Sequence, residues 1–286
     1  MMSGPKAARE LIAFYLDAGV DALLGEAPVN RMADDIAPQR LGAAGSAQPE
    51  DKTARRVRSE SPSAIASSQA APQKQRPAAA PASTDAAVMA AREAAKNATT
   101  LEELRALLAD FEGCALRATA TQLVFADGNP QSHVMFVGEA PGYDEDIVGT
   151  PFVGRSGKLL DRMMAAIGLD RTSTYIANVV PWRPPGNRTP TPQETAICLP
   201  FIRRQIELAD PDILVGLGGP AMQTLLAIKD GITRSRGRWF SYDTGRREIR
   251  ALATFHPAFL LRSPLQKRFA WRDFLALKKA LGGGHG

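Results

Sequence analysis

Four short apolar runs, separated by segments with helical periodicity, constrain the fold of this chain more than any other feature. The runs are His133 to Val137, Tyr175 to Val180, Ile213 to Leu217 and Ile249 to Phe255. Helical patterns cover Ser156 to Ile167 and Pro192 to Leu208, and another begins at Pro220. Strands that alternate with helices form parallel sheets through right-handed crossovers. The sequence therefore predicts an α/β fold, a three-layer αβα sandwich around a central, mainly parallel four-stranded sheet.

Two more helices are expected to flank this alternation. Thr100 followed by Glu103 forms a capping-box pattern for a helix from Leu101 to Phe111. An amphipathic pattern from Gln266 to Leu281 predicts a helix that closes the domain. We place the compact domain at residues 85–286.

The N-terminal part has a different composition. Residues 43–84 consist almost wholly of Ala, Pro, Ser, Gln, Thr and charged residues, with Val57 and Ile65 as their only large aliphatics. Such a segment cannot bury enough apolar surface to offset its chain entropy. Before it, apolar residues recur at helical spacing between Arg9 and Glu26. We expect a short amphipathic helix in residues 1–26, a disordered linker in 27–84, and docking of the helix on the main domain or on a protein partner.

Cysteine content and hydropathy exclude several classes of protein. Two cysteines in 286 residues rule out a disulfide-stapled secreted scaffold and fall short of the four ligands of a cysteine-only metal site. No segment approaches the run of about 18 apolar residues that spans a bilayer, and the N-terminus does not resemble a secretory signal. We expect a cytoplasmic protein without a membrane partner.

The charge is distributed unevenly along the chain. Residues 231–286 contain 12 Lys or Arg and 3 Asp or Glu, whereas residues 101–230 contain 11 basic and 16 acidic residues. Clustered cations indicate either a polyanion-binding surface or a solvated basic face. Charge alone does not separate these two interpretations.

The segments that leave the four predicted strands are rich in Gly, Pro and polar residues. Because ligands bind beyond the carboxyl ends of parallel strands, one composite site is expected there. No Walker motif, G-x-G-x-x-G fingerprint or G-x-S-x-G elbow is complete. The segments are 138–142, 181–188, 216–219 and 256–257.

Two features of the chain that follows the first predicted strand bear on chemistry. The acidic residues Glu139, Asp144, Glu145 and Asp146 crowd one turn. Glu145 is either part of a polar cleft or a charge at a helix N-terminus. Phe152, between Gly149 and Gly154, is either a local core residue or a platform for a planar ring.

These motifs together resemble one family, the family 4 uracil-DNA glycosylases. The resemblance extends from about Gly113 to Leu281, with the motifs in order and at comparable spacing. The family excises uracil from DNA, which starts base excision repair. The motifs are Gly138 to Gly142 with Glu145 and Asp146, Pro151 to Gly154, Asn178 to Val180, Arg183 to Pro192 and His256 to Ala258.

The resemblance implies a role for each matching residue in a monofunctional hydrolase. Phe152 would stack on the flipped uracil, and Asn178 would bind its Watson–Crick edge, with the backbone of Glu139 and Ala140 lining the pocket. His256 would donate to the uracil O2. Glu145 would orient water or stabilise the sugar cation.

The resemblance also implies a DNA-binding surface on the basic C-terminal part. Leu261 or Arg262 would fill the vacated base stack, and Arg183 and Arg188 would contact phosphate. The expected substrate is uracil in single- or double-stranded DNA, bound by a monomer. The alternative is a catalytically degraded DNA-binding module that acts with a polymerase or repair partner.

The chain departs from the family at the iron–sulfur cluster. Cys114 and Cys198 match two of the four ligand positions, while Phe111 and Trp182 occupy the other two. Neither Phe nor Trp ligates iron, so we expect no cluster and no other metal or cofactor. The four side chains are expected to pack as a small hydrophobic plug instead.

Overall fold

The computed structural model describes residues 83–282, which all belong to one compact unit, Gln73–Gly286. The expected helix in residues 1–26 lies outside these residues, as does the expected linker up to residue 82. The first described helix, α2 (Thr84–Asn97), is capped by Ser83, whose hydroxyl accepts from the Ala86 N–H.

A six-stranded sheet forms the centre of the molecule, in the order β1-β3-β2-β4-β6-β5. The four inner strands pair in parallel and correspond to the four apolar runs. Their bounds are β2 (Val134–Gly138), β3 (Tyr175–Asn178), β4 (Ile213–Leu217) and β6 (Glu248–Thr254).

The predicted number of four strands is wrong, because an antiparallel strand is added at each edge. On one side β1 (Asp127–Gly128) pairs with β3, and on the other β5 (Trp239–Asp243) pairs with β6. β1 has only two residues, and β5 combines half-buried with exposed positions. Edge strands lack the continuous apolar run that identifies a strand buried on both faces.

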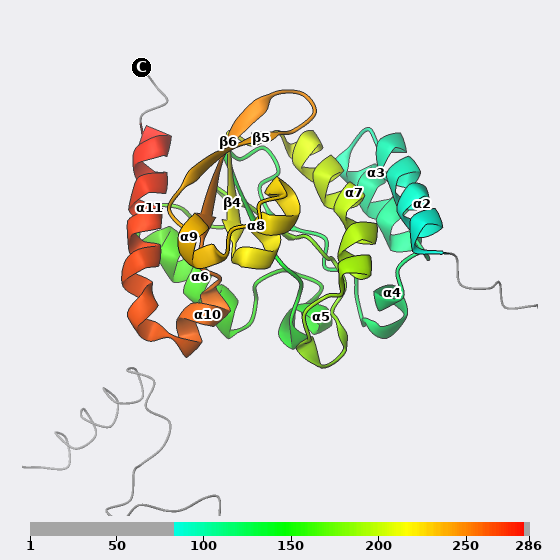
Figure 1. Ribbon diagram of the computed structural model, residues 1–286, viewed down its shortest axis with the longest axis horizontal. Helices are drawn as coiled ribbons and strands as arrows, with labels where there is room; N and C mark the ends of the chain where they lie inside the picture. The colour runs from blue at the N-terminus through cyan, green and yellow to red at the C-terminus, as the bar shows by residue number, and fades with distance from the viewer. Residues whose placement is uncertain (1–82, 283–286) are drawn as a thin grey trace, which may run out of the picture. The chain divides into compact units, whose positions relative to one another are not determined.

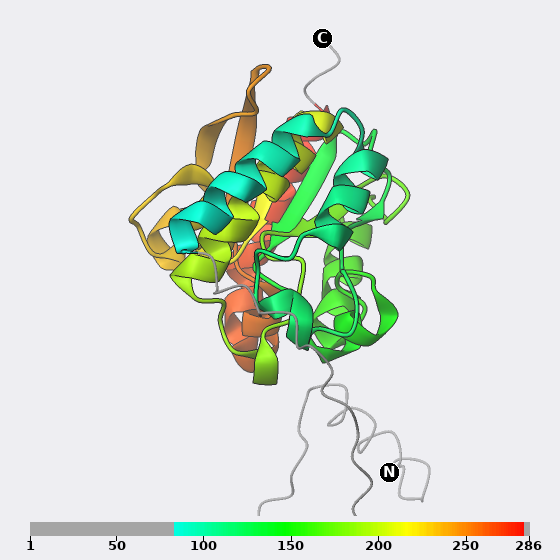
Figure 2. The ribbon, with the colours of Figure 1, turned by 90° about the vertical axis from the view of Figure 1, so that its right-hand side faces the viewer.

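Helices cover both faces of this sheet, which confirms the three-layer αβα fold (Figure 1). Along β2, Met135 and Val137 face one layer while Val134 and Phe136 face the other, as the period of two requires. The first layer contains α3 (Leu101–Asp110), α7 (Pro192–Ala209) and α8 (Gly219–Leu226), and α2 lies alongside α7 (Figure 2). The second contains α6 (Arg155–Ala165) and α11 (Lys267–Gly282).

The remaining elements are short and lie mainly in connections. The four predicted strands, and the predicted helices that correspond to α3, α6, α7 and α11, begin and end within two residues of the expected positions, whereas α2 and the short helices were not predicted. The short helices are α4 (Leu116–Thr119), α5 (Tyr143–Val148), α9 (Ile232–Ser235) and α10 (Pro257–Arg262), with 3-10 turns at Pro185–Asn187 and Pro264–Gln266.

The register of the sheet brings four chain segments to one edge. Gly138 pairs with Asn178, and Leu217 pairs with Thr254, so the carboxyl ends of β2, β3, β4 and β6 are level. The chain order reverses at β2, whose two neighbours are β3 and β4. A crevice is expected at such a switch point.

Candidate functional site

A cavity of about 570 Å³ opens at this carboxyl edge. All four loops that were expected to converge contribute to its wall. Six predicted site residues that line it are Glu139, Ala140, Glu145, Phe152, Asn178 and His256. Arg188 and Arg262 also line it, whereas Arg183 and Leu261 do not.

Phe152 lies deep in the cavity in a strained backbone conformation. Its φ of 57° falls in the left-handed region, which an aromatic residue rarely adopts, and its side chain is only 4% exposed. Its ring centroid is 5.5 Å from that of His256, with the planes tilted by 31°. The ring can therefore stack on one face of a planar ligand that lies next to His256.

Asn178 ends β3 beside the same ring. Its Oδ1 is buried and has no hydrogen-bond partner among the described residues. A buried amide oxygen without a partner is costly, and such an atom in a cavity wall indicates a ligand donor. Gly138 makes this packing possible, because a Cβ there would lie 2.4 Å from Asn178 Oδ1 and 2.7 Å from Phe152 Cζ.

His256 is held as a single neutral tautomer. It is the N-cap of α10, and its Nδ1 accepts from the Ala258 N–H at 3.1 Å. Because Nδ1 is an acceptor, the proton of the neutral ring is on Nε2. Burial, reinforced by the positive charge of Arg262, lowers the pKa of His256 to about 4. At neutral pH the ring is an uncharged Nε2–H donor.

The two carboxylates in the cavity have different environments. Glu145 Oε2 accepts from the Gly142 N–H at 3.0 Å and Oε1 accepts from the Gly154 N–H at 2.9 Å. Glu145 thus caps α5 and ties it to the loop that follows Phe152. Glu139 has a buried Oε1 without a partner among the described residues, and burial raises the pKa of its carboxyl group.

A buried network behind His256 was not identified from the sequence. Asp273 of α11 is 1% exposed and accepts from Thr254 Oγ1 at 2.9 Å and from the Arg236 guanidinium. It fixes the end of β6 two residues before His256. These residues are far apart in the chain and form no local motif, so no sequence signal marks them.

The expected DNA-contacting residues differ in the contacts they make. Arg188 binds Glu194 through two hydrogen bonds of 2.7 and 2.8 Å, which lower the pKa of Glu194 to about 2. Arg183 donates to Asn187 at 2.6 Å and lies 5.0 Å from the Tyr143 ring centroid. Leu261 and Arg262 are exposed at the end of α10.

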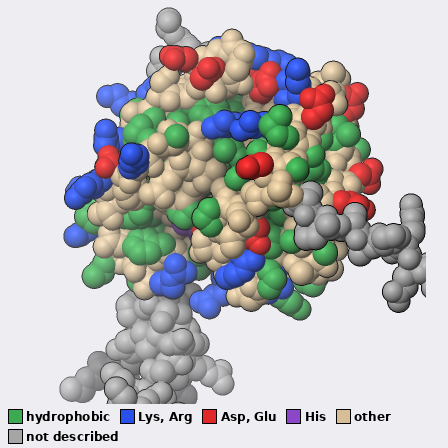
Figure 3. Space-filling model, turned by 45° about the vertical axis from the view of Figure 1, so that its right-hand side comes forward, with side chains coloured by type: hydrophobic (Ala, Val, Ile, Leu, Met, Phe, Trp, Pro, Cys, Tyr) green, Lys and Arg blue, Asp and Glu red, His purple; other side chains and the backbone are tan. Residues whose placement is uncertain are grey.

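Cationic side chains are also frequent on the surface near these elements. Figure 3 shows Lys and Arg side chains along the left and lower margins of one face, and α5 and α10 lie at the lower end in Figure 1. Arg155, Lys267, Arg268 and Arg272 are exposed on α6 and α11.

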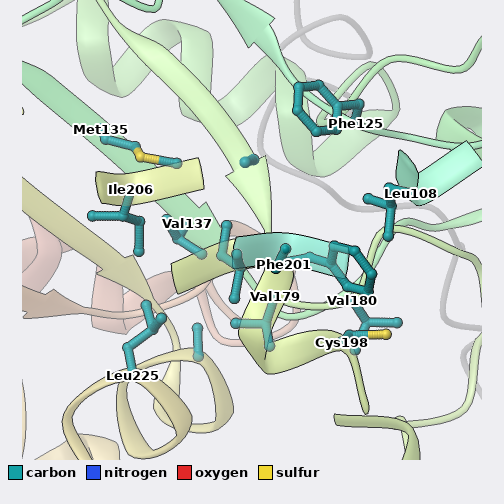
Figure 4. Close-up of a cluster of buried hydrophobic side chains, with 14 of the residues drawn as sticks. Leu108, Phe125, Met135, Val137, Val179, Val180, Cys198, Phe201, Ile206 and Leu225 are labelled. Atoms are coloured by element: carbon teal, nitrogen blue, oxygen red, sulfur yellow. The ribbon is translucent and has the colours of Figure 1, made fainter. Parts of the chain in front are cut away.

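The four positions of the family's cluster ligands lie in the apolar core. The Cys114 and Cys198 sulfur atoms are 4.0 Å apart, and the Phe111 ring packs edge-on against Phe201 at 5.0 Å. Trp182 is 2% exposed. Figure 4 shows Cys198 in the same buried cluster as Leu108 and Phe201. This donor set, two thiols with two aromatic rings, does not fit a cluster that needs four thiolates.

Residues 83–282 lack both a metal-binding cluster and a membrane-spanning helix. They contain no group of three or more His, Cys, Asp or Glu side chains placed to hold a metal ion. Among the same residues, no helix is both long enough and apolar enough to cross a bilayer.

Comparison with known proteins relates the chain to one family. The chain is 41% identical over 169 residues to a Type-4 uracil-DNA glycosylase of Thermotoga maritima, covering 57% of this chain and 86% of that protein. It is 39% identical over 173 residues to a Type-4 uracil-DNA glycosylase of Archaeoglobus fulgidus, covering 59% and 87%.

A third similarity is to part of a much larger protein. A DNA polymerase of Bacillus phage SP01 is 29% identical over 157 residues, which is 16% of its length. The family model of the uracil DNA glycosylase superfamily matches residues 125–275, more than half of the chain and all of the cavity wall. The chain belongs to the uracil-DNA glycosylase superfamily.

Proposed function

We propose that this protein is a uracil-DNA glycosylase, which flips uracil out of DNA and hydrolyses its N-glycosidic bond to start base excision repair. The observation that carries this proposal is the combination, in one cavity, of the Phe152 ring, the free Asn178 Oδ1 and the neutral Nε2–H donor of His256. Relatives that share the motifs are named Type-4 uracil-DNA glycosylases.

Base recognition rests on Phe152 and Asn178. A flipped base stacks on an aromatic face. The Phe152 side chain is almost completely buried and lines the cavity. An amide side chain supplies one acceptor and one donor, which match the N3–H and O4 of uracil. Cytosine presents an acceptor and a donor in the reversed order. The backbone of Glu139 and Ala140 completes the wall on the other side of the base.

His256 stabilises the leaving group. Cleavage of the bond between N1 and C1′ leaves negative charge on the base, part of which lies on O2. The Nε2–H of His256 donates to this oxygen more strongly as the charge develops, which is the preorganised stabilisation that lowers a barrier most effectively. A neutral donor suffices, since the ring does not need to transfer its proton.

The carboxylates act on the sugar side. Water adds to C1′ as the base leaves, and the sugar passes through a cation-like state. Glu145 accepts one backbone N–H at each oxygen, and each carboxylate oxygen keeps a second lone pair for water. We assign Glu145 the combined role of holding the loop and facing the sugar with negative charge.

DNA contacts are assigned to the rim of the cavity. Leu261 or Arg262 at the end of α10 fills the gap that the flipped base leaves, and Arg183 and Arg188 contact phosphate. Substrates in this assignment are single- and double-stranded DNA that contain uracil. Arg188 would exchange one carboxylate oxygen of Glu194 for a phosphate oxygen.

We further propose that the enzyme works without an iron–sulfur cluster, in the cytoplasm. The apolar packing of Phe111 and Trp182 supports the first point, because both positions already contribute to the core that a cluster would otherwise organise. The low cysteine content supports the second, since small numbers of unpaired thiols are usual in reducing compartments.

The test compares the wild-type chain with two histidine variants. Each protein is incubated in EDTA with a labelled oligonucleotide that contains one uracil, and abasic sites are cleaved with alkali. His256→Ala is expected to lower the single-turnover rate by about 10² to 10³, the usual effect of removing one such donor. His133→Ala is the matched control, because His133 is exposed and pairs with Asp212.

Each outcome decides the proposal. Uracil release by the wild type and by His133→Ala, with a strong loss in His256→Ala, supports a glycosylase. Binding of the oligonucleotide by the wild type without release of base would reject it, and equal rates in all three proteins would reject the role of His256.

A further inference from the structure

Arg171, in the turn between α6 and β3, contacts the loop that carries Phe152. Its Nη1 donates to the Pro151 carbonyl at 3.1 Å and its Nη2 donates to the Phe152 carbonyl. The same guanidinium pairs with Asp127 at 2.5 Å and with Asp161 at 2.9 Å. Every edge of the guanidinium therefore has a partner, two of which are consecutive carbonyls of the Phe152 loop.

The Phe152 loop needs such support because its backbone is strained. The φ of 57° at Phe152 is unfavourable for a non-glycine residue, and such conformations persist only where the surroundings determine them. On its other side the Phe152 carbonyl is in close contact with α6. A Cβ on Gly157 would lie 1.6 Å from the Phe152 oxygen, so only glycine fits there.

The two supports fix the direction of the Phe152 ring. The carbonyls of Pro151 and Phe152 both point toward Arg171, and the side chain of Phe152 points toward His256 and Gly138. Rotation of this peptide out of the left-handed region would break contacts with Arg171. The ring would then leave the position beside His256.

We propose that Arg171 is a positioning residue, which holds Phe152 in the conformation that stacks on the extruded base. This inference rests on the proposed function for the role of Phe152. The contacts of Arg171 with the Pro151 and Phe152 carbonyls, called the clamp below, do not depend on that function. The two carboxylates orient the guanidinium, and their hydrogen bonds outweigh the effect of burial and raise its pKa. Asp127 belongs to the edge strand β1, and thus that short strand anchors the clamp.

Lysine is the informative replacement at position 171. An ammonium group keeps the positive charge beside Asp127 and Asp161 but lacks the planar fork that reaches two carbonyls and two carboxylates together. Arg171→Lys therefore separates loss of charge from loss of the clamp.

The chain contains a matched control in Arg247. Its guanidinium also contacts two carboxylates, of Asp210 and Asp212, and two consecutive carbonyls, of Asp210 and Pro211. It lies at the amino end of β4, the opposite edge of the sheet from the cavity. Arg247→Lys removes the same kind of fork without touching the Phe152 loop.

The kinetic test is a double-mutant cycle with Phe152→Leu in the full chain. Arg171→Lys is expected to lower the single-turnover excision rate by about tenfold to a hundredfold, as small misplacements of reacting groups do. In the Phe152→Leu background the same substitution should change the rate less than about twofold, since coupled residues are not additive. Arg247→Lys should leave the rate unchanged in both backgrounds. The affinity for uracil-free DNA should be the same in all variants.

A second readout does not depend on activity. The Phe152 ring lies over His256, so its displacement changes the ring-current shift of the His256 ring protons in NMR spectra. Arg171→Lys should move this signal, which the spectrum of His256→Ala identifies, and Arg247→Lys should not.

These readouts separate failure of the clamp from failure of the proposed function. An unmoved His256 signal in Arg171→Lys, or an equal rate loss in both backgrounds, would overturn the positioning role. A wild type that releases no uracil but shows the shifted signal in Arg171→Lys would reject the function and leave the clamp intact.

Discussion

Single residues in the cavity wall carry chemistry that depends on their surroundings. His256 is the clearest case, because its Nδ1 contact with Ala258 selects the tautomer and its burial keeps the ring neutral. Phe152 and Asn178 depend in the same way on Gly138, which leaves room for both. The residue types determine which functional groups are present, whereas the neighbouring residues determine the tautomer, charge and orientation of each group.

The buried neutral state of His256 predicts a pH dependence of stability. An unfolded histidine titrates near 6.5, and burial lowers the pKa in the folded chain to about 4. As the pH falls below 6.5, the unfolded chain takes up a proton that folded His256 does not, so the free energy of unfolding decreases. Between pH 6.5 and pH 5 this contribution is about 1.5 kcal/mol.

The measurement is urea unfolding of the wild type and His256→Gln at both pH values. The glutamine variant lacks the titration, so the difference in stability between the two proteins should shift by that amount in favour of the variant at pH 5. Parallel pH dependence in the two proteins would show that the ring titrates normally.

Gly138 predicts a steric effect on the cavity. In Gly138→Ala the new Cβ would lie within 3 Å of Asn178 Oδ1 and Phe152 Cζ, so both must move. We expect a loss of excision rate of about a hundredfold with unchanged affinity for uracil-free DNA. Gly282→Ala is the control, because a Cβ there meets nothing within 4 Å. Equal activity of the two variants would mean that the cavity absorbs the methyl group.

At the scale of elements, short helices at the ends of strands position the site. α5 presents Glu145 between Gly142 and Gly154, and α10 presents His256 at its first turn. Both helices are too short to be stable alone, so their caps and contacts with the sheet hold them. The residues that cap these helices are also the residues that line the cavity.

Glu145→Gln is therefore expected to affect stability as well as excision. Glutamine has one acceptor oxygen, so either the Gly142 or the Gly154 N–H loses its partner. A loss of about 1 to 2 kcal/mol in the free energy of unfolding should follow. Asp144→Asn, at the exposed neighbour, is the control in denaturant unfolding. A Glu145→Gln chain with full stability and no activity would instead indicate a role in chemistry alone.

At the scale of the molecule, the parallel sheet explains why distant segments meet. Residues from Glu139 to Arg262 reach one cavity because the four inner strands end level at one edge. The helical layers bury the two faces and leave this edge open. Part of the core contains Cys114, Cys198, Phe111 and Trp182, the positions where the resemblance to family 4 places the cluster ligands.

The apolar character of that region predicts independence from iron. The full chain purified in EDTA should contain no stoichiometric iron by elemental analysis, and its excision rate and unfolding midpoint should match those of untreated protein. Iron at several atoms per chain, lost together with stability in Cys198→Ser, would contradict this expectation. The serine variant is otherwise expected to lose only the packing of one sulfur atom.

Sequence patterns by themselves determined the strands β2, β3, β4 and β6, the helices α3, α6, α7, α8 and α11, and the meeting of four loops at one edge. They succeed because apolar periods of 2 and 3.6 are local, and because parallel strands must end at a common edge. These patterns did not predict the edge strands β1 and β5, since neither is a continuous apolar run.

Only the tertiary structure decided the states of the functional groups. The tautomer and low pKa of His256, the two backbone contacts of Glu145 and the clamp of Arg171 on Phe152 all arise from atoms brought together through space. Arg171 meets Asp127 from 44 residues away along the chain, and no local pattern encodes that distance. Periodicity specifies which face a residue occupies, but burial and hydrogen bonding depend on which other segments fold against it.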